Sequence, residues 1–191
     1  MHTRPTSGPF LANQFLIAMP GLADPNFSKT VTYIFKHSEQ GAMGLVINRP
    51  TKMHLAHVFD QLQLTCTDVA VESQPVLQGG PVHTEQGFVI HPPGGSWEYS
   101  MEISQHVHIT TSRDILVSMA RGEGPRDAMV ALGFANWDAG QLEAEITANT
   151  WLTVDYNQQV LFDVPYDDRW RAAGRLLGID VTNLGVDAGH A

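Results

Sequence analysis

The sequence predicts an α+β fold built on a mixed, mostly antiparallel sheet. Nine short apolar runs have the length of strands, whereas four segments have helical periodicity. Connections between strands are mostly too short for a crossover helix, which favours hairpins. With 191 residues, 43% of them hydrophobic, the chain suits one domain over residues 1–191, and a small lobe at about residues 51–110 is an open alternative.

The strands are predicted where apolar or β-branched residues form short runs between turn residues. Pro20 and Gly21 end the first run, and the Pro/Gly run at 92–95 follows the fifth. The predicted strands cover residues 15–19, 31–35, 44–47, 76–78, 87–91, 106–110, 129–134, 151–156 and 160–162.

The helices are predicted from apolar stripes and capping residues. Thr51 is expected to cap a helix that runs to Leu62, and its stripe consists of Leu55, Val58, Phe59 and Leu62. Ser112 suits the N-cap of a helix over 113–121. Pro165 suits the first turn of a last helix that ends at Gly178.

Residues 131–152 are predicted to form a strand, a tight turn, a capped helix and a second strand. Asn136 is expected to reverse the chain with positive φ, because Asn tolerates that region better than most residues. Asp138 suits the helix N-cap, and Gln141 has the spacing of a capping box. Glu143 and Glu145 cannot share a helical face, so they are a poor acid/base pair, and a solvated helix surface is the favoured interpretation of both.

Composition argues against several classes of function. The net charge of −9 opposes binding to nucleic acid, and a charged fraction of only 16% leaves room for an apolar contact surface. The single cysteine, Cys66, excludes an internal disulfide, and no nearby Lys or Arg would activate its thiol. No run approaches a membrane span or a signal peptide, so we expect a soluble, cytoplasmic protein.

No metal or cofactor site is predicted. His54 and His57 are three residues apart, and His106 and His108 share one face of a predicted strand, but neither pair has a third ligand nearby. The Gly79-Gly80 pair is either an anion-binding nest or a tight turn that allows close backbone packing, and the turn is favoured.

Two polar segments have both a structural and a functional interpretation. Asp24, Pro25 and Asn26 favour a type I turn, although Asp24 could instead belong to a site. Arg49 is either an anion ligand or a member of a salt bridge, and the salt bridge is favoured.

Motifs throughout the chain resemble those of the AlgH/YqgE family of bacterial proteins. One departure is Gly133-Phe-Ala-Asn-Trp137, where the family usually has Gly-Tyr-Ala-Gly-Trp. The resemblance implies a sheet bent into a pseudo-barrel with flanking helices, and the family name reflects a suggested role in regulating alginate production. The matching motifs are Phe15–Gly21, Asp24–Phe27, Gly41–Pro50, Gly79–Val82, Thr111–Asp114, Gly140–Glu143, Asn149–Leu152 and Gly189–Ala191.

The function predicted from these observations is that of a non-catalytic regulatory or protein-interaction protein with a protein partner. A transcription-related regulator would have to act indirectly, because the acidic chain argues against nucleic-acid binding. The alternative is a small-ligand-binding protein or a hydrolase-type enzyme with a pocket near Arg49 and Glu143. No catalytic residue is predicted, and the candidate ligand-binding residues are Asp24, Asn26, Asn48, Arg49, Gly79, Gly80, Asn136, Trp137 and Glu143.

Overall fold

The computed structural model describes residues 10–185. Residues 1–9 and 186–191, including the Gly189–Ala191 motif, lie outside this range. The strands are β1 (Gln14–Ala18), β2 (Val31–Ser38), β3 (Gly41–Val46), β4 (Pro50–His54), β5 (Pro75–Gln78), β6 (Val82–His91), β7 (Ser100–Glu102), β8 (His108–Thr110), β9 (Met129–Asp138) and β10 (Trp151–Asp155). The helices are α1 (Leu55–Gln61), α2 (Val69–Glu72), α3 (Arg113–Ala120), α4 (Gln141–Thr147) and α5 (Arg169–Leu176), with a π-helical turn η1 (Gln159–Asp163) and a 3-10 turn η2 (Tyr166–Asp168).

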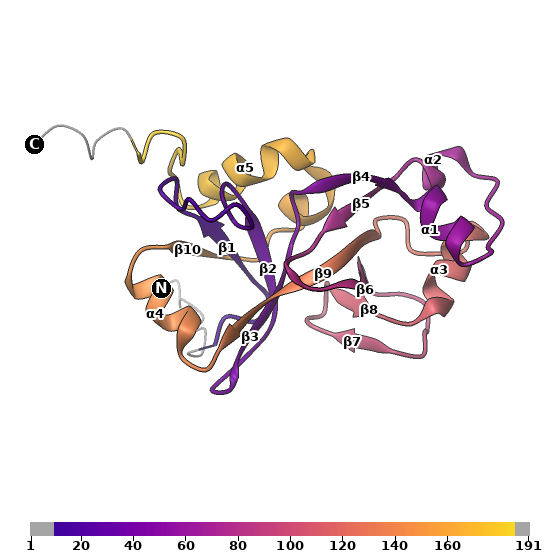
Figure 1. The fold of residues 1–191 in the computed structure, drawn as a ribbon, viewed down its shortest axis with the longest axis horizontal. Coiled ribbons are helices and arrows are strands. Elements are labelled where there is room, and N and C mark those ends of the chain that lie inside the picture. The colour runs from indigo at the N-terminus through magenta and orange to yellow at the C-terminus, as the bar shows by residue number, and fades with distance from the viewer. Residues whose placement is uncertain (1–9, 186–191) are drawn as a thin grey trace, which may run out of the picture.

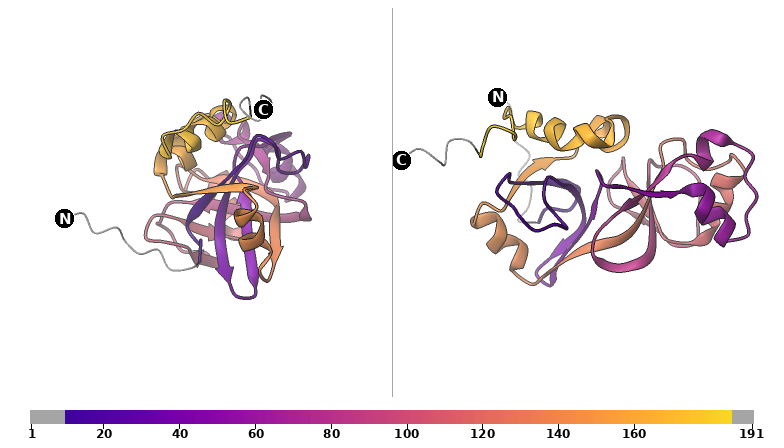
Figure 2. Two further views of the ribbon diagram at one scale, coloured as in Figure 1. Left: turned by 90° about the vertical axis from the view of Figure 1, so that its left-hand side faces the viewer. Right: turned by 45° about the horizontal axis from the view of Figure 1, so that its top comes forward.

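The strands form one mixed sheet, which confirms the predicted fold class. The main path runs β10-β1-β2-β3-β9-β6-β8-β7, and all its neighbours are antiparallel. Strand β5 adds a parallel pairing to β9 and an antiparallel pairing to β4. The sheet curls into a half-barrel with the helices outside it (Figures 1 and 2).

Two parts of the molecule lie side by side along its long axis (Figure 1). We call β1–β3, β10, α4 and α5 the barrel half, and β4–β8 with α1–α3 the cleft half. Strand β9 belongs to both. Its first residues pair with β5 and β6 in the cleft half, and its last residues, Ala135–Asp138, pair with β3 in the barrel half.

The barrel half is buried on both faces of its sheet, which explains why its strands are continuous apolar runs. Phe15 and Ile17 of β1 point into the central core, whereas Leu16 and Ala18 point into a second core beneath α4. The central core continues into the cleft half through Phe88 of β6. A third core there contains Leu55 and Phe59 of α1, as the predicted stripe requires.

The Gly79-Gly80 pair allows two backbones to touch, as the favoured interpretation predicted. A Cβ on Gly79 would lie 2.3 Å from the carbonyl oxygen of Gly133, and a Cβ on Gly80 would lie 2.1 Å from the carbonyl carbon of Phe134. Gly133 has φ of +75°, and a Cβ there would lie 2.3 Å from the carbonyl oxygen of Gly80. The end of β5 is therefore pressed against the middle of β9.

A buried arginine at the start of α5 links the chain after β3 to the turn that precedes α5. Arg169 is 2% exposed, and its guanidinium donates to the carbonyl oxygens of Val164 and Ile47, each at 2.8 Å. Its guanidinium carbon lies 4.4 Å from the centroid of the Tyr166 ring. Burial lowers the pKa of Arg169 to about 10.

The helix predicted over 51–62 begins later than expected. Residues 50–54 form β4, and helix α1 covers only Leu55–Gln61. The Thr51 hydroxyl donates to the carbonyl oxygen of Val76 on β5 at 2.7 Å, so it serves strand pairing rather than capping. The prediction of Thr51 as a helix cap was therefore wrong.

The turn predicted at Asn136 is also wrong. Asn136 continues β9 opposite Met43, and it is not among the residues with positive φ. The chain reverses further on, where Gly140 has φ of +77° and precedes α4. Asp138 is thus not the N-cap, although its N–H donates to the Gln141 side chain at 3.0 Å.

Two smaller predictions need correction. Residues 160–162 belong to the π-helical turn η1 and not to a strand, and the N–H of Val160 donates to the Asn157 side chain at 3.0 Å. His106 lies in a bend before β8 and stacks on Tyr156, so of the two histidines only His108 is in the strand, where it contacts His91. Val107 and Ile109 are buried in the central core, as the predicted alternation requires.

Two kinds of feature are absent from residues 10–185. None of the helices described is long and apolar enough to cross a membrane. Likewise, this part of the chain contains no group of three or more His, Cys, Asp or Glu side chains that could hold a metal ion.

Candidate binding cleft

The structure divides the nine predicted ligand-binding residues among four places. Asp24, Asn26, Asn48 and Arg49 gather around the loop between β1 and β2. Gly79 and Gly80 are packed against β9. Asn136 and Trp137 line a small hollow beside β3, and Glu143 lies on α4.

The loop between β1 and β2 is held by the side chains that the sequence singled out. The N–H of Asn26 donates to the Asp24 carboxylate at 2.9 Å, which confirms the predicted turn. The Asn48 amide donates to the carbonyl oxygen of Lys29 and accepts from the N–H of Val31, each at 2.9 Å. Lys29 has φ of +57°, an uncommon conformation for this residue type.

Arg49 contacts carbonyl oxygens rather than an acid. Its guanidinium donates to Pro25 at 2.6 Å and to Ser28 at 2.8 Å. Burial lowers the pKa of Arg49, and the charge of Asp24 opposes that effect. The favoured prediction of a salt bridge was therefore wrong, because neither ion pair found within residues 10–185 includes an arginine.

The Glu145 side chain accepts hydrogen bonds from other side chains of the protein, so the prediction that it belongs to a solvated helix surface was wrong. One carboxylate oxygen accepts from the indole N–H groups of Trp137 and Trp151, each at 2.9 Å. The other accepts from the Gln141 amide at 3.0 Å. Both tryptophans are buried, so Glu145 satisfies two donors that have no access to water.

Glu143 lies two residues before Glu145 on α4, and its side chain contacts His37 of β2. The carboxylate lies 2.5 Å from Nε2 of His37, and Nδ1 accepts from the N–H of Leu11 at 2.8 Å. This pattern assigns the proton to Nε2, which donates to Glu143. The backbone N–H of Glu143 and the His37 contact hold the pKa of Glu143 below its usual value, although burial raises it.

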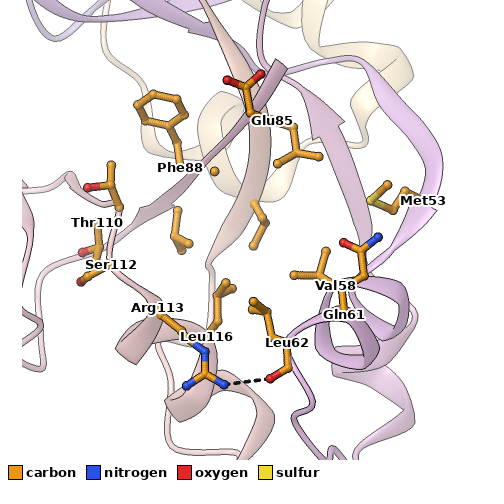
Figure 3. A pocket seen from close by; sticks show the side chains of 15 residues that line it. Met53, Val58, Gln61, Leu62, Glu85, Phe88, Thr110, Ser112, Arg113 and Leu116 are labelled. Atoms are coloured by element: carbon orange, nitrogen blue, oxygen red, sulfur yellow. Dashed lines mark hydrogen bonds between the residues drawn. The ribbon is translucent and has the colours of Figure 1, made fainter. Parts of the chain in front are cut away.

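A cleft of about 390 Å³ lies in the cleft half between α1 and α3. Val58 and Leu62 of α1 form one wall, and Leu116 of α3 forms the other. Strands β6 and β9 supply the floor. Leu62 and Leu116 lie next to each other, and Phe88 lies at the far end (Figure 3). The volume is in the range of small-ligand pockets, and the lining is mainly apolar.

Several polar side chains around the cleft are already hydrogen bonded within the protein. Arg113 donates to the carbonyl oxygen of Leu62 at 2.8 Å, which ties the start of α3 to the end of α1 (Figure 3). The Ser112 hydroxyl donates to Asp114 at 2.5 Å and accepts from the N–H of Tyr99 at 3.1 Å.

Thr110, which also lines the cleft, is engaged by a buried histidine. Nδ1 of His91 lies 2.8 Å from the carbonyl oxygen of Pro92, so this nitrogen carries the proton and donates. Nε2 then accepts from the Thr110 hydroxyl at 2.7 Å, and the same hydroxyl contacts Ser100 at 2.8 Å. Burial lowers the pKa of His91, which keeps the ring neutral.

The sequence contained part of the signal for this cleft. Val58 and Leu62 belong to the predicted apolar stripe, but only Leu55 and Phe59 of that stripe are fully buried. The stripe is thus wider than the core requires, and its outer residues face the cleft. Leu116 and Leu132 carried no such signal, because their contacts across α3 and β9 depend on the tertiary fold.

The chain is similar to known bacterial proteins over almost its whole length. The model of a family described as AlgH-like matches residues 15–182. A UPF0301 protein of Thioalkalivibrio sulfidiphilus is 53% identical over 97% of this chain and 100% of its own. A UPF0301 protein of Xanthomonas campestris is 51% identical over 95% of this chain and 96% of its own.

Two solved structures share the fold. The solution structure of the AlgH protein from Pseudomonas aeruginosa has a TM-score of 0.79 and 45% identity, and the match covers 99% of this chain and 100% of that one. A crystal structure of a Corynebacterium diphtheriae protein has a TM-score of 0.68 over 92% of this chain and 88% of that one. At 17% identity, the second likeness concerns the fold alone.

Proposed function

This chain belongs to the AlgH-like family, and we propose that it is a non-catalytic protein-interaction protein whose cleft holds the apolar face of a basic partner segment. A regulatory role, as the resemblance implied, would then be exerted through this partner and not by contact with nucleic acid.

The observation that carries the proposal is how the polar groups at the cleft are used. Ser112, Arg113 and Thr110 each have hydrogen-bond partners inside the protein. Thr110 and its partner His91 are fully buried and Ser112 is 9% exposed, so these groups have little access to a substrate. What the cleft offers is apolar surface on two helices and a sheet, which suits binding through burial.

The charge around the cleft indicates the character of the partner. Residues 51–128 contain nine acidic and four basic residues. Glu85 lines the cleft and is exposed, the exposed Asp60 precedes the lining residue Gln61 in sequence, and Arg113 is the cation among the lining residues. A segment with Lys or Arg flanking its apolar residues would therefore be attracted and oriented. Burying each large apolar side chain contributes roughly 1.5–3 kcal/mol before the costs of association.

The hydrolase-type alternative near Arg49 and Glu143 has less support. Arg49 donates to the loop between β1 and β2, whereas Glu143 contacts His37. Each side chain thus has its own structural partner, in a different part of the barrel half.

The test is site-specific crosslinking from the cleft in the full-length protein. A photoreactive amino acid is placed at Leu62 and, as a matched control, at Val69, which is 72% exposed on α2 outside the cleft. Capture is done with and without nuclease, and the crosslinked peptides are sequenced by mass spectrometry. We expect an apolar, Lys/Arg-containing segment from Leu62 only, and capture that weakens as salt is raised.

Two results would contradict the proposal. Equal capture from both positions would show that the cleft has no special role. Loss of all capture after nuclease treatment would show that nucleic acid mediates the contact.

A further inference from the structure

We propose that a second site, in the barrel half, binds an anion of the phosphate class, either inorganic phosphate or a small phosphomonoester. This site is independent of the cleft and of the function proposed for it. It is a pocket of about 300 Å³ between the loop ahead of β2, the end of β3 and the start of α5.

Three cations converge on this pocket from segments far apart in the sequence. Lys29 comes from the loop ahead of β2, Arg49 from the end of β3 and Arg171 from α5. Asp167 is the acidic residue among those that line it. The pocket is therefore positive in a chain whose net charge is −9. No Lys or Arg within residues 10–185 forms a close salt bridge, although the charge of Asp24 acts on Arg49 and Arg171 acts on Asp180.

Arg49 is held in place with hydrogen-bonding capacity to spare. Two of its five N–H donors are used by the carbonyl oxygens of Pro25 and Ser28. These bonds fix the guanidinium plane, so little further ordering is needed when an anion binds. Burial lowers the pKa of Arg49 and the charge of Asp24 offsets this only in part, so a further anion would stabilise the guanidinium charge.

Lys29 is presented to the pocket by a strained backbone. Its φ of +57° is maintained because the Asn48 amide donates to its carbonyl oxygen at 2.9 Å. Conformations of this kind are unfavourable for a residue with a Cβ atom and persist only where the surroundings impose them. The same two neighbouring residues, Asn48 and Arg49, thus position both the backbone of the loop and one of the cations.

The arrangement favours phosphate over a carboxylate. Cations that approach from three segments can each take a different oxygen of a tetrahedral anion, whereas a carboxylate has two oxygens. Tyr166 and Trp170 add aromatic surface beside the cations. The indole N–H of Trp170 is already used by the carbonyl oxygen of Ala18, so its contribution is apolar contact for the organic part of a phosphomonoester.

The test is an NMR titration of the ¹⁵N-labelled full chain with inorganic phosphate, phosphoserine, serine and citrate at constant ionic strength. We expect phosphate and phosphoserine to shift amide signals of residues 28–29, 48–49 and 166–171, and serine to leave them unchanged. Tighter binding of phosphoserine than of phosphate would identify a phosphomonoester as the ligand, and the reverse order would identify free phosphate.

Exposed residues provide variants that should retain the fold. In Lys29→Gln with Arg171→Gln, we expect the Kd for phosphate to rise at least tenfold. Arg175→Gln removes an equal charge one turn further along α5, outside the pocket, and should change the Kd less than twofold.

Three outcomes would overturn the proposal. In the first, the titration leaves the signals of the pocket unchanged. In the second, citrate binds there and phosphate does not. In the third, Arg175→Gln weakens binding as much as the double variant, which would indicate diffuse attraction instead of a site.

Discussion

The cleft and the phosphate pocket differ in which groups the fold leaves without partners. At the cleft, Ser112, Arg113 and Thr110 are hydrogen bonded internally, and apolar surface remains. At the pocket, the aromatic residue Trp170 is largely buried, and the groups that line the open space include three cationic side chains. The comparison teaches that residue types alone do not indicate a site, because an arginine occurs at both. What differs is the surroundings, because Arg113 borders apolar side chains, whereas Arg49 lies beside two further cations, Lys29 and Arg171.

The largest expected effect is at Arg169, whose buried hydrogen bonds hold the barrel half together. Replacing it with Ala leaves the buried carbonyl oxygens of Ile47 and Val164 without their donors. We expect the free energy of unfolding to fall by about 3–5 kcal/mol. Urea denaturation measures this loss. Arg175→Ala on the same helix, at an exposed position, should change it by less than about 0.5 kcal/mol.

The two glutamates of α4 give the next largest effect. Glu145→Ala removes the acceptor for the two buried indoles Trp137 and Trp151, and we expect a loss of about 2–4 kcal/mol. Glu143→Ala should cost less than about 1 kcal/mol, because the Glu143 side chain is 47% exposed. Thermal unfolding with tryptophan fluorescence follows both changes, and equal losses would contradict the assignment.

Replacing Arg49 tests whether this side chain holds the loop between β1 and β2, binds the anion, or does both. Arg49→Ala breaks two hydrogen bonds to the loop that carries Lys29, and we expect a loss of about 1–2 kcal/mol together with loss of phosphate binding. Circular dichroism against temperature gives the stability. An unchanged melting temperature with lost binding would show that Arg49 contacts the ligand without holding the loop.

The smallest expected effect is a pH-dependent contribution of Asp114, at the edge of the cleft, to the free energy of unfolding. Burial raises the pKa of Asp114, but the Ser112 hydroxyl and the N–H of Glu98 lower it more, so the net shift is downward. A lowered pKa contributes stability above the unfolded value, and this contribution disappears as pH falls through the folded value. Asp114→Asn should therefore be less stable than the parent at pH 7, and the difference should vanish in acid. A difference that persists at pH 2 would contradict this.

Local patterns were enough to predict most of the sheet. Continuous apolar runs such as Phe15–Met19 become strands because both faces of the sheet are buried. The wrong secondary-structure predictions fall where a short segment fits both a helix pattern and a strand pattern. Thr51 has the properties of a cap, but its partner is Val76 on another strand. The apolar run at 160–162 fits a strand or a helical turn equally well at that length.

The sites were harder to predict, because they depend on contacts between distant segments. Trp137 and Trp151 lie on different strands, and nothing in the spacing shows that both reach Glu145. Arg49 was singled out from its position after a strand. Lys29 and Arg171 join it in the pocket only because the curled sheet brings α5 beside the loop ahead of β2.

The shared strand β9 has a consequence for any attempt to divide the protein. If the barrel half is removed, Ala135–Asp138 loses β3 and becomes an open edge, and removing the cleft half strips β5 and β6 from Met129–Leu132. Exposed edges of this kind pair with other chains. We therefore expect either half, expressed as a fragment, to aggregate, and the intact chain to melt in a single calorimetric transition.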